Sequence, residues 1–424
     1  MRSPAAVALV VLTTLGLTAC GSAVLHAPAG ATTPATADVA VALPVHPAFT
    51  LTRTPMAASA SSHLPTPPRV AGGGALGRYA APAVMYGVWD PRRGMALRSY
   101  GLANRQNGTP ANPNLSFRIG SVTKTFTATA VLLLVDDGRI KLDAPVSRYL
   151  GTLANALPNG RRATVRSLLN MTSGFPDYGD RGDGPFATSV LAPQRVWAPA
   201  QIIGVAAGLT GTPPGSFAYS NTNYVILGQL VVRESGMSFG TFVQKRILKP
   251  LGMRHTAIPS PTQTASVQLH GYLNATWPAF TPPPSAQTLA AAQAGEDVTD
   301  FSTSSAGAAA DGVSTLGDLA RWAAADFGDS LLRPATRAQR LRTVPADSLL
   351  RGSSYGLGLQ VEDGWHFHVG EVLGWETLAM ANPSSGQVVV VVRNACCGSA
   401  FENYVTAREA MPALAPIVDP VYAH

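Results

Sequence analysis

The chain has 424 residues, of which 46% are hydrophobic and 13% are charged, and its formal net charge is +7. This composition fits one large domain or two ordinary ones with a sizeable buried core. The positive charge comes mostly from scattered arginines without a basic run, which argues against a nucleic-acid-binding surface and indicates at most a mild preference for anionic surfaces.

The N-terminus has the pattern of an export signal. Arg2 provides a short positive region, and Ala5–Leu17 is an apolar run too short to span a bilayer comfortably. The run ends in Leu-Thr-Ala-Cys at residues 17–20, which resembles the lipobox of bacterial lipoproteins. This resemblance implies cleavage before Cys20, diacylation of its thiol and a lipid anchor in the cell membrane, with the protein extracytoplasmic. An ordinary or uncleaved signal peptide is the alternative.

Composition divides the chain into three parts. Residues 1–19 are expected to be a lipoprotein signal peptide. Residues 20–75, rich in Ala, Pro and Thr, are expected to be a flexible tether. Residues 76–416 contain the periodic segments and are expected to form one folded domain.

Strands are expected at both ends of this domain and helices between them. A hairpin is predicted at 83–90 and 95–104, and later strands at 355–361, 365–369, 375–381 and 387–393. Helices are predicted at 121–137, 224–235, 239–248, 316–327 and 401–411, with a long loop at 276–312. This order favours an α/β (α+β) fold, in which an antiparallel sheet built from both chain ends is flanked by helices and carries an inserted, mainly helical subdomain.

Ser121-Val122-Thr123-Lys124 is the most informative stretch for chemistry. Positions i and i+3 of a helix share a face, so the serine hydroxyl and the lysine amine are expected to lie together. A lysine kept neutral there can take the proton of the serine. The chain has only four lysines, and no other serine precedes one by three residues. Alone, the pattern also fits a serine that merely caps a helix.

Two further motifs follow in the chain, Tyr219-Ser220-Asn221 and His368-Val369-Gly370. In this order, the three motifs resemble those of the penicillin-recognising serine hydrolases, which include class C β-lactamases, D-alanyl-D-alanine carboxypeptidases and related esterases. The resemblance covers about residues 80–412 and is closest to the streptomycete-type carboxypeptidase. It implies a β-lactamase/transpeptidase-like fold, with residues 76–416 as the serine hydrolase domain.

The resemblance also implies roles for individual residues. Ser121 would form an acyl-enzyme, Lys124 would be its base with a pKa lowered by burial and a positive neighbour, and Tyr219 would shuttle protons. Asn221 would bind the substrate's amide carbonyl and hold Lys124. The supporting residues are on the late strand: His368 would tune the Tyr219 network, and the N–H of Glu371, after Gly370, would join that of Ser121 in an oxyanion hole.

Val369 and Glu371 depart from the carboxypeptidase pattern, in which hydroxyl residues help to bind the substrate's terminal carboxylate. A glutamate would repel a carboxylate, and valine offers no hydroxyl. A neutral ester or amide, or one with a positive group, would suit the site better. Acylation itself is not affected.

Other candidate sites are weaker. Cys396 and Cys397 are adjacent and could form a vicinal disulfide, pair between chains or stay free. His366 and His368 would share a strand face, but no second cysteine pair supports zinc, and no metal or cofactor is expected. Asp177, Asp180 and Asp183 lack the spacing of a calcium loop.

The leading hypothesis is a lipid-anchored, cofactor-free serine hydrolase that acts on a small molecule or a peptidoglycan peptide. D-alanyl-D-alanine carboxypeptidase and broad esterase activities are close rivals, and β-lactamase activity is third. A hypothesis of another class is a cell-wall-binding protein that kept the fold but lost turnover.

Overall fold

The computed structural model describes residues 81–396, apart from 93, 260–265, 274–281, 329–330 and 350–351. The expected signal peptide and tether, and the helix expected at 401–411, lie outside the described residues. Within the described part of the chain, no helix has the length and apolar character needed to cross a membrane.

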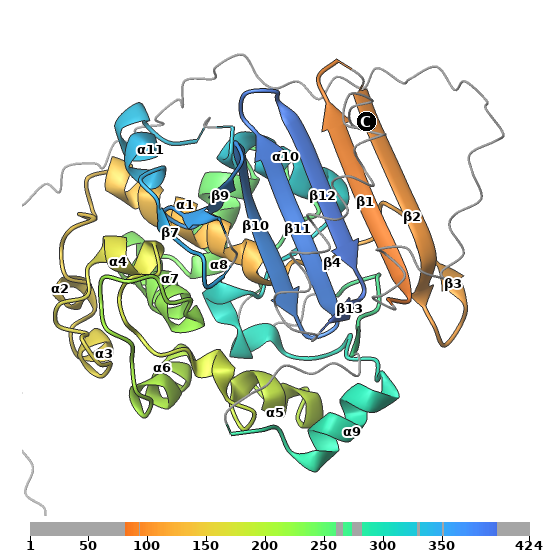
Figure 1. Cartoon of the computed structure of the whole chain (residues 1–424), viewed down its shortest axis with the longest axis horizontal. Coiled ribbons are helices and arrows are strands. Elements are labelled where there is room, and N and C mark those ends of the chain that lie inside the picture. The colour runs from red at the N-terminus through yellow and green to blue at the C-terminus, as the bar shows by residue number, and fades with distance from the viewer. Residues whose placement is uncertain are drawn as a thin grey trace, which may run out of the picture. The chain divides into compact units, whose positions relative to one another are not determined.

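A nine-stranded antiparallel sheet joins the two ends of the described chain (Figure 1). In spatial order its strands are β3 (Thr109–Pro110), β2 (Gly94–Asn104), β1 (Ala83–Asp90), β12 (Gln387–Arg393), β11 (Trp375–Asn382), β10 (Trp365–Val372), β9 (Gln360–Glu362), β8 (Ser354–Tyr355) and β7 (Val344–Pro345). The first strand therefore pairs with the last long one, with Val84 opposite Arg393 and Trp89 opposite Val388. This pairing confirms the expectation of a sheet built from both chain ends.

Two short ladders lie outside the main sheet. β4 (Phe117–Arg118) pairs with β6 (Val313–Ser314), and β5 (Tyr272–Leu273) pairs with β13 (Ala395–Cys396). Cys396 is disulfide-bonded, so the expectation that it might stay free is wrong; Cys20 and Cys397 lie outside the described residues.

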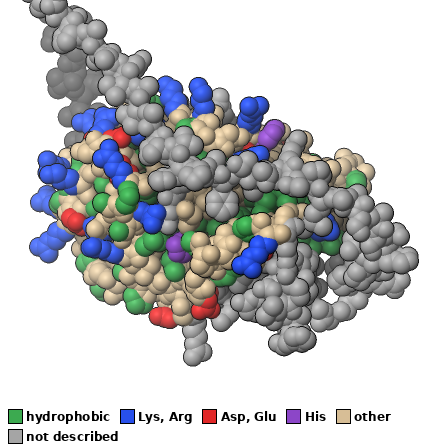
Figure 2. Space-filling model, turned by 90° about the horizontal axis from the view of Figure 1, so that it is seen from above, with side chains coloured by type: hydrophobic (Ala, Val, Ile, Leu, Met, Phe, Trp, Pro, Cys, Tyr) green, Lys and Arg blue, Asp and Glu red, His purple; other side chains and the backbone are tan. Residues whose placement is uncertain are grey.

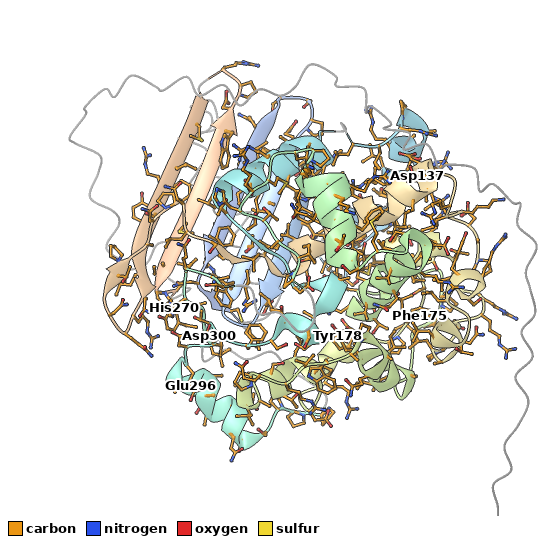
Figure 3. All side chains as sticks on the ribbon, turned by 180° about the vertical axis from the view of Figure 1, so that it is seen from behind. Asp137, Phe175, Tyr178, His270, Glu296 and Asp300 are labelled. Carbon is orange, nitrogen blue, oxygen red and sulfur yellow. The ribbon has the colours of Figure 1, made fainter. Side chains whose placement is uncertain are left out.

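All α-helices of the described residues lie between β4 and β7. They are α1 (Thr123–Asp136), α2 (Ser147–Leu150), α3 (Thr152–Asn155), α4 (Val165–Leu169), α5 (Pro185–Leu191), α6 (Pro199–Ala207), α7 (Asn221–Ser235), α8 (Phe239–Val243), α9 (Ala286–Ala294), α10 (Leu316–Asp326) and α11 (Pro334–Arg340). Short 3₁₀ turns are η2 (Gly120–Val122), η3 (Tyr178–Asp180), η5 (Thr303–Ser305) and η6 (Gly307–Ala309), and η4 (Gln244–Leu248) is a π-helical turn after α8. Seen from behind, α10 covers one face of the sheet, and α1 and α7, which contact each other, lie in the helical part of the fold (Figure 3).

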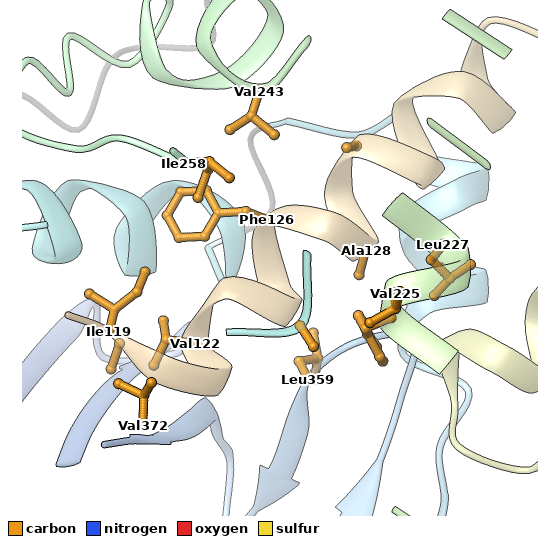
Figure 4. Close-up of a cluster of buried hydrophobic side chains, with 14 of the residues drawn as sticks. Ile119, Val122, Phe126, Ala128, Val225, Leu227, Val243, Ile258, Leu359 and Val372 are labelled. Carbon is orange, nitrogen blue, oxygen red and sulfur yellow. The ribbon is translucent and has the colours of Figure 1, made fainter. Parts of the chain in front are cut away.

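Helix α1 is buried on every side, as its sequence predicts. Phe126 stacks on Trp322 of α10, with ring centroids 3.8 Å apart. At the start of the helix, Ile119 and Val122 lie beside Val372 of β10 (Figure 4). One apolar core thus joins the sheet to the helices and fixes the position of Ser121 relative to β10.

Two predicted elements differ from the structure. The single strand expected at 355–361 is wrong: β8 and β9 form a tight hairpin, closed where Gly356 N donates to the carbonyl of Leu359 at 2.8 Å. Gly358 adopts φ +82°, and a Cβ there would lie 2.2 Å from Ala128 of α1. The long loop expected at 276–312 is wrong in part, because its alanine-rich portion forms α9, capped by Ser285.

Candidate active site

Ser121 lies in the 3₁₀ turn η2, directly before α1, rather than in the first α-helical turn. Gly120 has φ +51°, a conformation that favours glycine, and a Cβ there would lie 2.6 Å from the backbone nitrogen of Glu371. Thr123 Oγ1 donates to the carbonyl of Gly120 at 2.7 Å and accepts from Gly312 N at 3.0 Å. These contacts hold the serine turn against β10 and the strand β6.

Lys124 directs its amine at the serine hydroxyl. Its Nζ lies 2.8 Å from Ser121 Oγ, 2.7 Å from Asn221 Oδ1 and 3.1 Å from the carbonyl oxygen of Ala309. A neutral amine has two N–H groups and one lone pair. Because the Asn221 and Ala309 oxygens accept but cannot donate, they engage both N–H groups and leave the lone pair facing the serine. In this form Lys124 is able to take the Ser121 proton.

The surroundings of Lys124 favour its neutral form. The side chain is fully buried, and burial lowers its pKa to about 7. Its Nζ lies 4.9 Å from the ring centroid of Tyr219 and 5.7 Å from that of Tyr224. The predicted positive neighbour is wrong: the charge that acts on Lys124 is the Asp177 carboxylate, which raises the lysine pKa and partly opposes the effect of burial.

Tyr219 approaches the same hydroxyl from the segment before α7. It shares a hydrogen bond with Ser121, which lowers its pKa, but burial outweighs this and raises the pKa well above its ordinary value. The phenol therefore stays protonated at neutral pH and is able to donate a hydrogen bond or a proton. Tyr219 is half-buried, as is Ser121, so a substrate is able to reach both from solvent.

Asn221 opens helix α7 and joins the lysine to a carboxyl group. Its Oδ1 accepts from Lys124, and its Nδ2 donates to Asp177 Oδ2 at 2.9 Å. Asp177 Oδ1 also accepts from the backbone N–H of Gly179 at 2.9 Å. Desolvation, followed by the charge of Asp180, raises the pKa of Asp177 to about 7. A carboxyl and an amine that titrate in the same range thus contact opposite ends of one amide.

Asp177 was not among the residues that motif reasoning assigned to the site. It directly follows Thr-Ser-Gly-Phe-Pro at residues 172–176. The one sequence signal that could have indicated a role in the site is an acidic side chain in this loop. Its neighbours Phe175 and Tyr178 are labelled in Figure 3, within the helical part of the fold. The proximity of Asp177 to Asn221 depends on tertiary packing across 44 positions of sequence.

The late strand β10 supplies backbone rather than side chains to the serine turn. A Cβ on Gly370 would lie 2.0 Å from the carbonyl oxygen of Ile119, so only glycine allows this approach. The backbone N–H of Glu371 consequently lies beside the turn that carries Ser121. Two backbone N–H groups so placed are able to stabilise an oxyanion.

His368 is buried on β10, but its direct partner is not Tyr219. Its Nε2 lies 3.0 Å from the Tyr355 hydroxyl, and its Nδ1 lies 2.6 Å from the carbonyl oxygen of Val369. Burial, followed by the charge of Lys124, lowers its pKa to about 3. His368 is therefore neutral at physiological pH, and it contacts the hydroxyl of Tyr355 rather than that of Tyr219. His366 instead faces the Phe327 carbonyl at 3.3 Å, and the described residues contain no group of three or more metal-ligating side chains.

The profile of the Beta-lactamase family matches residues 60–399, which is most of the chain. The chain belongs to the beta-lactamase family. Similar proteins of known structure share its fold: a D-stereospecific amidohydrolase from Streptomyces is 27% identical with a TM-score of 0.63, covering 77% of this chain and 94% of its own. A D-amino acid amidase from Ochrobactrum anthropi SV3 is 25% identical with a TM-score of 0.66, covering 80% and 96%. The expected β-lactamase/transpeptidase-like fold is confirmed.

Curated relatives match over shorter stretches. A putative penicillin-binding protein, PbpX, of Bacillus subtilis is 30% identical over 37% of this chain and 37% of its own length. A beta-lactamase of Pseudomonas fluorescens is 31% identical over 41% and 45%, and esterase EstB of Burkholderia gladioli is 32% identical over 37% and 42%. The chain thus spans less than half the length of these relatives, and it belongs with serine hydrolases of the β-lactamase and penicillin-binding type.

Proposed function

We propose that the protein hydrolyses an amide or ester through an acyl-enzyme on Ser121. The observation that carries this proposal is the amine of Lys124, placed 2.8 Å from Ser121 Oγ with two other acceptors for its N–H groups. Ser121 attacks the substrate carbonyl carbon as Lys124 takes its proton. The tetrahedral oxyanion is held by the N–H groups of Ser121 and Glu371.

Collapse of this intermediate breaks the bond to the leaving group, which receives a proton from Tyr219. A water then attacks the acyl-enzyme and gives one proton to the Tyr219 phenolate. Lys124 returns to Ser121 Oγ the proton that it took during acylation, so the acyl–serine bond breaks and the acid product is released. Asn221 keeps Lys124 in place, and its resemblance to the family's asparagine assigns it the contact with the substrate's amide carbonyl.

The charges around the site favour substrates without a carboxylate near the reacting bond. Two carboxyl groups act on Tyr219 and raise its pKa: Asp177 and Glu371. We therefore propose neutral or amine-bearing amides and esters as substrates, in keeping with the amidase and esterase relatives. A D-alanyl-D-alanine carboxypeptidase is the second candidate, favoured by the three motifs, and a non-catalytic cell-wall-binding protein is the alternative of another class.

We also propose that the protein is exported and held at the cell membrane by a lipid on Cys20, extracytoplasmic and without a nucleic-acid partner. The short apolar run and its terminal cysteine support this location. The face seen in Figure 2 displays more Lys and Arg than Asp and Glu side chains, which agrees with the net charge of +7 and suits an anionic surface.

The mass of the intact protein after incubation with a fluorophosphonate tests the nucleophile. We expect one adduct in the wild type and in Ser384→Ala, a control that changes an exposed serine in a loop, and none in Ser121→Ala. An adduct of equal yield in Ser121→Ala would overturn the proposal.

Turnover of three substrates then separates the candidates: D-phenylalanine amide, a p-nitrophenyl ester and a D-alanyl-D-alanine peptide. We expect the amide or the ester to be hydrolysed faster than the peptide, because the peptide carries a carboxylate beside the reacting bond. Faster hydrolysis of the peptide would favour the carboxypeptidase. Labelling without turnover of any of the three would favour the binding protein.

A further inference from the structure

Asp177, Asn221 and Lys124 form a directed chain of hydrogen bonds. Asn221 donates from Nδ2 to Asp177 Oδ2 at 2.9 Å and accepts at Oδ1 from Lys124 Nζ at 2.7 Å. An amide has its donor and its acceptor on opposite arms, so its orientation matters. A carboxylate accepts only, and it therefore selects the orientation in which the amide oxygen faces the lysine.

The loop that carries Asp177 is held in place by other contacts. Thr222 Oγ1 donates to the carbonyl of Pro176 at 2.6 Å, and Ser220 Oγ donates to the same oxygen at 3.1 Å. The Tyr178 hydroxyl donates to the carbonyl of Ser305 at 2.8 Å. The loop is thus fastened to α7 and η5 on both sides of Asp177, and the contact with Asn221 is not needed to hold it.

We propose that Asp177 is a positioning residue that orients the Asn221 amide toward Lys124, and that its charge sets the pH range in which Lys124 acts as the base. This inference rests on the proposed function, because it needs Lys124 to activate Ser121. Asp177 acts through Asn221 and by its field, without touching the reacting atoms.

Other titratable groups surround the pair from several elements. They are Asp180 of η3, Tyr178 of η3, Asp311 before β6, Tyr219 before α7, Tyr224 of α7, and His368 and Glu371 of β10. Of the charged groups, Asp177 is the one that acts on Lys124 itself, and it raises the lysine pKa against the larger effect of burial. Loss of this charge should therefore lower the pKa of Lys124 further, so that the neutral amine persists to lower pH.

The test compares full-length wild type, Asp177→Asn and Asp183→Asn by the rate of Ser121 labelling with a fluorophosphonate across pH. Asparagine at 177 turns an N–H₂ toward Asn221, so Asn221 rotates its own N–H₂ toward Lys124, where it competes with Ser121 for the lone pair. We expect Asp177→Asn to label about ten- to hundredfold more slowly at its optimum. We expect the acidic limb of its pH–rate profile, where the labelling rate falls as the pH decreases, to move down by about one pH unit.

Asp183→Asn is the matched control, because Asp183 lies in the same segment and pairs at the surface with Arg181 at 2.6 Å. It should keep the wild-type rate and limb. Wild-type behaviour of Asp177→Asn would overturn the inference, and so would a slower rate with an unmoved limb, since a merely structural role would produce that result.

Asp177→Glu provides a second test if Asp177→Asn does not fold. It keeps the charge but displaces the carboxylate, so we expect a slower rate with the limb unmoved. A wild-type rate in Asp177→Glu would refute the positioning role. Ser121→Ala distinguishes failure of the proposed function from failure of this inference. If Ser121→Ala is labelled like the wild type, the proposed function fails. If only the Asp177 variants are labelled like the wild type, this inference alone is refuted.

Discussion

At the scale of single residues, the site combines two opposite pKa shifts. Burial depresses the pKa of Lys124 from 10.5 and desolvation elevates that of Asp177 from 3.8, each to about 7. Each shift reflects the unfavourable free energy of burying a charged group away from water. The arrangement keeps a usable base at neutral pH but reduces stability there, as is common for active sites.

The sign of this effect can be tested. The raised pKa of Asp177 contributes stability that is present below 3.8 and is lost as the pH rises through about 7. The lowered pKa of Lys124 contributes stability that is present above 10.5 and is lost as the pH falls through about 7. The contribution of the pair to the free energy of unfolding should therefore be smallest near neutral pH.

Urea denaturation of the wild type and of Lys124→Met/Asp177→Asn across pH measures this contribution. We expect the double variant to be more stable than the wild type near pH 7, by about 1 kcal/mol or more, with the difference shrinking toward acidic pH. A double variant that is less stable at every pH would contradict this account.

At the scale of elements, the contact between β10 and the serine turn depends on the absence of side chains. A Cβ on Gly370 would meet the Ile119 carbonyl at 2.0 Å and Val122 N at 3.1 Å. Neither neighbour is a flexible side-chain end, so the turn or the strand must move.

Gly370→Ala should therefore destabilise the protein by about 1–3 kcal/mol and sharply reduce labelling of Ser121. The matched control is Gly204→Ala in α6, where a Cβ would meet nothing within 4 Å. Alanine there should leave labelling unchanged and raise stability by up to about 1 kcal/mol. Thermal melting and the labelling rate measure both effects, and equal behaviour of the two variants would show that the close approach does not matter.

At the scale of the whole described domain, one apolar core runs through the sheet and the inserted helices. It includes Met85 of β1 and Val390 of β12 as well as Ile202 of α6 and Leu230 of α7. A buried ion pair between Arg340 and Asp326, with N–O distances of 2.6 and 2.7 Å, adds a polar link between α11 and α10. A shared core of this kind favours cooperative unfolding.

We therefore expect tryptophan fluorescence and far-ultraviolet circular dichroism to give the same urea midpoint. Phe126→Ala, which removes the stack on Trp322, should lower both midpoints together and cost about 3–5 kcal/mol. Separate midpoints for the two probes would show that the sheet and the inserted helices unfold independently.

Local sequence patterns were sufficient for the strands and for the central pair of the site. The hairpin of β1 and β2, the strands β10 to β12 and the burial of α1 follow from alternation, turn residues and apolar composition, which act over a few positions. The proximity of Ser121 and Lys124 follows from their spacing, because residues three apart share a face both in an α-helix and in the 3₁₀ turn that carries Ser121. The β8–β9 hairpin was missed, since its glycine turn is defined by a close approach to α1.

The charge state of the site was decided by tertiary packing alone. Lys124 and Asn221 lie 97 positions apart, and only the packing of α7 against α1 brings them into contact. The partner of His368 and the sign of the charge next to Lys124 likewise depend on which distant loops are folded over the amine. Spacing along the chain determines which groups share a helix face, whereas burial and electrostatic environment depend on every segment that surrounds a group, and these are set only when the chain is folded.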